Sequence, residues 1–149
     1  MSESIFKSIK SYQSEGDEGT VIGMKILIVD FKELVLSTLG DFMRDCGHEI
    51  FTAKSAEEAV ERDGEGEDID AILIDPGDTQ YVVNSGISKV HERYPGADIV
   101  LMGFGSMDSD LALANGVFAF FKYPLHYPLH LCELEVILAR ISEKRALAN

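Results

Sequence analysis

Short runs of consecutive apolar residues recur along this chain, and most of them end at a charged residue or a turn signal. Such runs are typical of strands that are buried on both faces of a parallel sheet. Between them, apolar residues recur at intervals of three and four, which predicts amphipathic helices. The strands predicted in this way span residues 25–30, 48–53, 69–74, 99–102 and 117–121.

Helical patterns alternate with these strands. Gly47 follows the first pattern, where glycine commonly ends a helix, and Ser55 with Glu58 forms a capping box that opens the second. The polar segment from Asp78 to Gly86 is predicted to be a loop. The helices are expected over 35–46, from 55 onward and over 87–94, then from a cap at Asp108 or Ser109 through 115, and from 131 to a basic turn at 144–145. With right-handed crossovers, this alternation predicts a five-stranded doubly wound parallel sheet of the flavodoxin-like, three-layer α/β/α class.

The length of 149 residues suits one domain with a full core, and 46% hydrophobic with 26% charged residues is a globular composition. A polar, glycine-containing stretch at residues 14–19 resembles a linker. We therefore divide the chain into an N-terminal extension or linker, residues 1–23, and a domain over residues 24–149.

The formal net charge is −13. Binding to nucleic acid or to an anionic membrane requires clustered Lys and Arg, so we expect neither as a direct partner. The two cysteines, Cys46 and Cys132, fall on apolar helix faces, and neither a signal peptide nor a long apolar span is present. We therefore expect a cytoplasmic protein with reduced thiols. His48 and His91 have no partner pattern, and we expect them at the surface.

Two of the predicted strands end in a carboxylate, Asp30 after the first and Asp75 after the third. Ligands of open α/β sheets bind beyond the carboxyl ends of the strands. If the two strands are parallel neighbours, both carboxylates converge on one pocket, and oxygen ligands of this kind suit Mg²⁺. The alternative is that each aspartate simply ends a strand and caps the segment that follows.

Over about residues 24–144 the chain resembles the receiver domains of two-component response regulators. The resemblance depends on residues 25–30 (Lys-Ile-Leu-Ile-Val-Asp), 46–53 (Cys-Gly-His-Glu-Ile-Phe-Thr-Ala), 70–75 (Asp-Ala-Ile-Leu-Ile-Asp) and 116–124 (Gly-Val-Phe-Ala-Phe-Phe-Lys-Tyr-Pro). It implies that Asp75 accepts a phosphoryl group and that Mg²⁺ is held by Asp30, Asp75 and the backbone carbonyl of Gly77. It also implies that Lys122 contacts the phosphoryl oxygens.

Several positions depart from the receiver pattern. Phe31 replaces the second carboxylate of the acidic pair, which weakens the expected Mg²⁺ site. The hydroxyl position after the fourth strand falls near Met102 or Gly103, so that Ser106 is a substitute only if its loop folds back. Without a gap, Tyr123 aligns with the conserved lysine of the family. Lys122 then reaches the pocket only through a bulge, because a shift of one residue moves a side chain to the other face of a strand.

Our leading hypothesis is a receiver domain in a two-component phosphorelay, with a sensor histidine kinase or phosphotransfer protein as partner. The alternative is a phosphorylation-independent pseudo-receiver that acts as a protein-interaction or dimerisation module. The resemblance allows a homodimer through the fourth helix, fifth strand and last helix. Metal-assisted phosphate hydrolysis is less well supported, because no general base is evident. We expect no enzymatic activity beyond self-catalysed phosphoryl transfer to Asp75.

Overall fold

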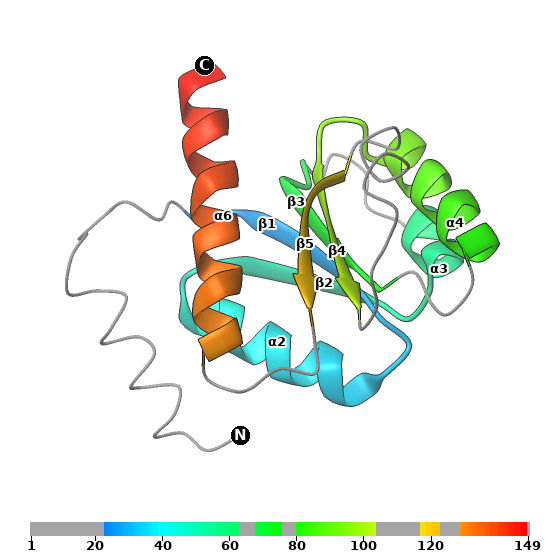
Figure 1. The fold of residues 1–149 in the computed structure, drawn as a ribbon, viewed down its shortest axis with the longest axis horizontal. Helices are drawn as coiled ribbons and strands as arrows, with labels where there is room; N and C mark the ends of the chain where they lie inside the picture. Colours follow the sequence, from blue (N-terminus) through cyan, green and yellow to red (C-terminus); the bar gives the residue numbers. More distant parts are fainter. Residues whose placement is uncertain (1–22, 63–67, 76–79, 104–116, 123–128, 149) are drawn as a thin grey trace.

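The computed structural model describes residues 23–62, 68–75, 80–103, 117–122 and 129–148. Its five strands form one parallel sheet in the order β2-β1-β3-β4-β5 (Figure 1). The strands are β1 (Lys25–Val29), β2 (Glu49–Ala53), β3 (Ala71–Ile74), β4 (Asp98–Gly103) and β5 (Val117–Lys122). This confirms the predicted flavodoxin-like class and strand order.

Helices cover both faces of the sheet (Figure 1). The described helices are α2 (Glu33–Asp45), α3 (Ala56–Glu61), α4 (Gln80–Arg93) and α6 (Leu129–Ala148). Side chains of α2 and α6 pack with Ile26, Ile28 and Leu73 in one core cluster, while α3 and α4 pack with Leu27 and Ile72 in the other. Alternate residues of the same strands therefore face opposite helix layers, which explains the continuous apolar runs in β1, β3 and β4. The helix predicted over 109–115 lies outside the described residues.

Two predicted helix boundaries are confirmed in detail. Gly47 follows α2 with a φ of +98°, a left-handed conformation that glycine adopts without steric cost. The Ser55 hydroxyl accepts a hydrogen bond from the Glu58 N–H at 3.0 Å. The Glu58 carboxylate in turn accepts one from the Lys54 N–H at 2.8 Å. These bonds satisfy donors at the start of α3 that have no partner within the helix.

The prediction of a loop up to Gly86 was wrong from residue 80 onward, because α4 begins at Gln80. The glycine reflects packing: a Cβ at position 86 would lie 3.3 Å from the Ala56 Cβ on α3. The Tyr94 hydroxyl just beyond α4 donates to the Ala59 carbonyl at 2.8 Å, which holds the two helices together. Close helix packing therefore accounts for a residue that resembles a loop signal in the sequence.

The prediction that His48 lies at the surface was also wrong. Its side chain is buried, and its Nδ1 accepts a hydrogen bond from the Met24 N–H at 3.1 Å. Its Nε2 lies 3.4 Å from Oε1 of Glu135 on α6. The imidazole thus connects Met24, directly before β1, with Glu135 on α6. His91 is half-buried.

No helix among the described ranges is long and apolar enough to cross a membrane. Both Cys46 and Cys132 are free thiols with partly buried side chains. Burial, and to a lesser extent the negative charge of Glu135, raises the pKa of the Cys132 thiol. Residues 1–22, which make up most of the predicted extension, lie outside the described residues.

Candidate functional site

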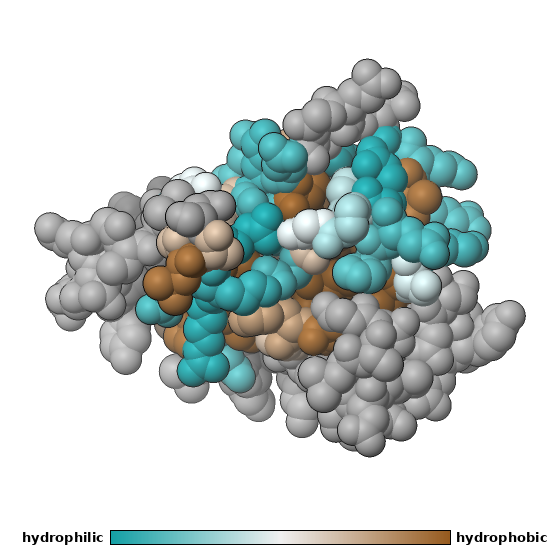
Figure 2. All heavy atoms as spheres, turned by 90° about the horizontal axis from the view of Figure 1, so that it is seen from above, coloured by the Kyte–Doolittle hydropathy of each residue, from teal (hydrophilic) through white to brown (hydrophobic). Residues whose placement is uncertain are grey.

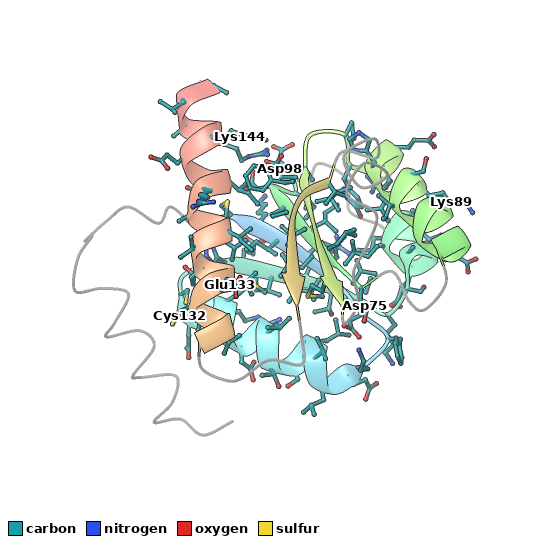
Figure 3. All side chains as sticks on the ribbon, viewed as in Figure 1. Asp75, Lys89, Asp98, Cys132, Glu133 and Lys144 are labelled. Atoms are coloured by element: carbon teal, nitrogen blue, oxygen red, sulfur yellow. The ribbon has the colours of Figure 1, made fainter. Side chains whose placement is uncertain are left out.

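The structure brings Asp30 and Asp75 together at the carboxyl edge of the sheet, because β1 and β3 are parallel neighbours in register. The Asp75 N–H donates to the Val29 carbonyl at 2.9 Å, and the Asp30 N–H donates to the Ala53 carbonyl at 3.0 Å. These bonds extend the strand ladder to both aspartates and fix their backbones. The Asp30 side chain is fully buried, and the Asp75 side chain is 10% exposed. Figure 3 labels Asp75 at this edge of the sheet.

A lysine that the sequence analysis did not consider lies beside both carboxylates. The Lys32 Nζ is 3.2 Å from Oδ2 of Asp75, to which it donates a hydrogen bond, and 3.7 Å from Oδ1 of Asp30. The same Asp30 oxygen accepts a hydrogen bond from the Lys32 backbone N–H at 2.8 Å. A carboxylate that accepts from the N–H two residues later is a common local turn, and here it fixes the start of the lysine side chain.

Phe31 does not fill the space between the aspartates. Its side chain is 67% exposed, and its ring centroid lies 4.8 Å from the Lys32 ammonium, within cation–π distance. Leu34, in the first turn of α2, is 78% exposed. We call these side chains the Asp30–Asp75 pocket: a cation beside two carboxylates, with the exposed Phe31 ring next to the cation.

For the other predicted site residues, the structure describes only part of the chain. Gly77 and Ser106 lie outside the described residues, as does the side chain of Lys122. The backbone of Lys122 ends β5 opposite Gly103 of β4. The Lys122 hypothesis required a bulge near the end of β5. The strand does contain an irregularity, but near its start. Ile99 pairs with Val117 and Val100 with Ala119, so Phe118 is an extra residue. The proposed phosphate contact by Lys122 stays a prediction.

The described side chains around the aspartates do not fit a Mg²⁺ site. Mg²⁺ requires oxygen ligands at about 2.0–2.1 Å in near-octahedral geometry. An ion between Asp30 and Asp75 at such distances would lie against the Lys32 ammonium, which repels it and already occupies an oxygen of each carboxylate. Among the described side chains, no cluster of three or more His, Cys, Asp or Glu is arranged to hold a metal ion.

A second acidic pair lies at the opposite edge of the sheet. Arg145 of α6 contacts Oδ1 of Asp70 at 3.2 Å and donates to the Gly96 carbonyl at 2.8 Å. Lys144 forms an ion pair with Asp98, and Figure 3 shows these two side chains near each other at this edge. Asp70, Gly96 and Arg145 line a cleft of about 590 Å³ between the ends of α4 and α6. Within this cleft Arg145 forms an ion pair with Asp70. In Figure 2, which views the molecule from above, hydrophilic side chains are interspersed with hydrophobic ones.

Comparisons with protein-family models and with curated proteins find no match. Comparison with solved structures finds a response regulator receiver domain protein from Clostridium thermocellum with a TM-score of 0.69 and 20% identity, covering 85% of this chain and 99% of that one. The chemotaxis response regulator CheY4 of Vibrio cholerae gives a TM-score of 0.64 and 18% identity, covering 78% and 99%. A protein described as pilus assembly-related from Burkholderia pseudomallei gives 0.63 and 22%, covering 79% and 90%.

These structures are similar over most of this chain and over nearly all of their own length, while their sequences are 18–22% identical to it. At this level of identity the comparison bears on the arrangement of the elements rather than on individual pocket residues. It agrees with the strand order and with the two helix layers described above. The chain therefore has the fold of response-regulator receiver domains.

Proposed function

We propose that the protein is a signalling module of the receiver type and that Asp75 accepts a phosphoryl group from a histidine kinase or phosphotransfer protein. One observation carries this proposal: the Asp75 carboxylate directly follows a central strand and has a cationic partner 3.2 Å away. A phosphoryl group brings several negative oxygens, and a fixed positive charge beside the acceptor stabilises them during transfer.

In the proposed step, an Asp75 carboxylate oxygen attacks the phosphorus of a phosphohistidine. The new bond is an O–P bond, and the N–P bond of the donor breaks. The imidazole nitrogen retains the electron pair and the donor histidine becomes neutral after proton uptake. Neither Asp30 nor Lys32 forms a bond to phosphorus. Lys32 acts through its positive charge, which offsets the negative charge of the phosphoryl oxygens.

The test is intact-mass analysis after incubation with acetyl phosphate, in parallel samples with Mg²⁺ and with EDTA. We expect the wild type to gain one phosphoryl group that hydroxylamine removes, and Asp75→Asn to gain none. Asp68→Asn is the matched control, because Asp68 is an exposed carboxylate at the opposite edge of the sheet. Modification of Asp75→Asn, or no modification of the wild type in either sample, would contradict the proposal.

A second candidate function is a phosphorylation-independent interaction module. Two observations favour it. Phe31, beside the Lys32 ammonium, and Leu34, in the first turn of α2, are both exposed. β4 ends in Met102 and Gly103, which carry no hydroxyl to contact a phosphoryl group. This candidate predicts that Asp75→Asn leaves partner capture unchanged, whereas Phe31→Ser with Leu34→Ser abolishes it.

A further inference from the structure

We propose that Lys32 is the resident cation of the Asp30–Asp75 pocket and that it takes the place of a divalent metal ion, so that the wild-type pocket works without Mg²⁺. This inference builds on the proposed function because it concerns the charge balance of the same site. It also stands by itself as a statement about cation binding.

The first argument is the position of the ammonium group. Its nitrogen lies within 4 Å of carboxylate oxygens from both aspartates, 3.2 Å from Asp75 and 3.7 Å from Asp30. The two acids come from neighbouring strands, whereas the lysine comes from the loop between β1 and α2. A cation shared by two converging carboxylates has the electrostatic role that a metal ion would have there.

The second argument is that several contacts fix the lysine in this place. The Lys32 N–H donates to Oδ1 of Asp30, and the Lys32 carbonyl accepts from the N–H groups of Val35 and Leu36 in the first turn of α2. The Phe31 ring lies 4.8 Å from the ammonium on another side. With its backbone held by a turn and a helix start, only the side-chain torsions of Lys32 have to be ordered when the ammonium pairs with the acids.

The third argument is competition. A lysine ammonium is a compact point charge with three donors, and it contacts an oxygen of each acid that would otherwise ligate a metal ion. A Mg²⁺ ion must displace this contact and approach a like charge that is covalently attached to the pocket. Removal of the lysine should therefore expose a cation site that the wild-type chain lacks.

The experiment is isothermal titration of the full-length protein with MgCl₂, for the wild type, Lys32→Ala and Lys32→Gln. Lys54→Ala is the matched control, because Lys54 is an exposed lysine that pairs with Glu33 near the same edge. We expect the wild type and Lys54→Ala to show no saturable binding. Both Lys32 variants should show saturable binding of one Mg²⁺, at least about ten-fold tighter than any residual binding by the wild type, as loss of a neighbouring like charge predicts. The gain should disappear when Asp30→Asn is added.

Saturable Mg²⁺ binding by the wild type that the Lys32 variants do not strengthen would overturn the inference. The glutamine variant keeps most of the side-chain volume, and circular dichroism of each variant checks that the fold is retained. If neither folded Lys32 variant binds Mg²⁺, the inference is also wrong, because the aspartates then do not form a cation site.

The acetyl phosphate experiment separates this inference from the proposed function. If Asp75 is modified in EDTA and Lys32→Ala loses that modification, both are supported. If Asp75 is modified only with Mg²⁺, the inference fails and the function stands. If Asp75 is never modified but the titration follows the expected pattern, the cation inference stands and the function fails in favour of the interaction module.

Discussion

The two edges of the sheet each hold a pair of aspartates on neighbouring strands, but they supply positive charge in different ways. At the amino edge, α6 provides Arg145 and Lys144 to Asp70 and Asp98. At the carboxyl edge, Lys32 from the adjacent loop contacts both Asp30 and Asp75. A pair of aspartates therefore anchors α6 at the amino edge, whereas a pair of aspartates holds a lysine ammonium at the carboxyl edge.

The type of cation explains much of this difference. The Arg145 guanidinium reaches a carboxylate and two backbone carbonyls at once, those of Asp70 and Gly96. A planar fork with five donors suits such multiple contacts, whereas an ammonium on a flexible stem is a single point of charge. The Asp70 carboxylate also accepts a hydrogen bond from the Lys25 N–H at 2.9 Å, which connects β1 to this network. The contacts at the amino edge thus hold α6 against the sheet.

The largest expected effect is at the amino edge. Arg145→Ala should lower the free energy of unfolding by about 1.5–3 kcal/mol, because it removes hydrogen bonds from a charged donor and leaves their acceptors behind. Urea denaturation followed by circular dichroism measures this. Arg140→Ala is the matched control, since Arg140 is an exposed arginine on the same helix. Equal losses in the two variants would show that the amino-edge contacts do not anchor α6.

A smaller change in stability is expected at the carboxyl edge. Lys32→Ala should lower the free energy of unfolding by about 1 kcal/mol in metal-free buffer, because it removes the hydrogen bond to Asp75. Arg145→Ala removes hydrogen bonds to two backbone carbonyls together with an ion pair. Added MgCl₂ should then raise the melting temperature of the variant but not of the wild type, since a ligand that binds only the folded state stabilises it. A loss as large as that of Arg145→Ala would remove the distinction between the two edges.

The smallest effect is expected at the exposed pair Glu33–Lys54, which lies near the carboxyl edge but outside the pocket. The Lys54 ammonium, through its hydrogen bond and its charge, lowers the pKa of Glu33, and Glu33 raises the pKa of Lys54. A carboxylate with a lowered pKa in the folded state adds stability above its unfolded pKa. That stability is lost as the pH falls through the folded value.

In Lys54→Ala the pKa of Glu33 should therefore rise toward its ordinary value, as measured by NMR titration of its side-chain carboxyl. Solvent screens such an exposed pair, so the stability that it adds is small. Its loss should therefore not move the denaturation midpoint at neutral pH by a measurable amount. An unchanged pKa of Glu33 in the variant would show that the pair does not persist in solution.

The sequence was sufficient to predict β1, β3 and β4, because each contains a continuous apolar run that is buried between the two helix layers. The start of α4 was missed because a glycine that packs against Ala56 looks like a loop residue. Lys32 was missed for a different reason. A lysine next to a helix start resembles an exposed residue, and its partner Asp75 lies 43 residues later in the chain.

The position of Asp75 was predictable as a strand end, and so was its convergence with Asp30 once the strands were taken as neighbours. The charge balance between them depends on the direction of the Lys32 side chain, which the periodicity of apolar residues does not predict. The hydrogen bond from the Lys32 N–H to Asp30 is the one local signal, a carboxylate two residues before the lysine. His48 was misjudged similarly, since its partners Met24 and Glu135 come from distant segments.

The turn that joins Asp30 to Lys32 has a consequence for how the pocket behaves in a changing environment. A cation attached by two peptide units has a local concentration fixed by chain geometry rather than by the surrounding solution. It cannot be diluted, chelated or exchanged for a competing ion. If the proposed role of Lys32 holds, a pocket built in this way keeps the same charge during magnesium starvation and magnesium excess, so its state does not depend on the magnesium concentration.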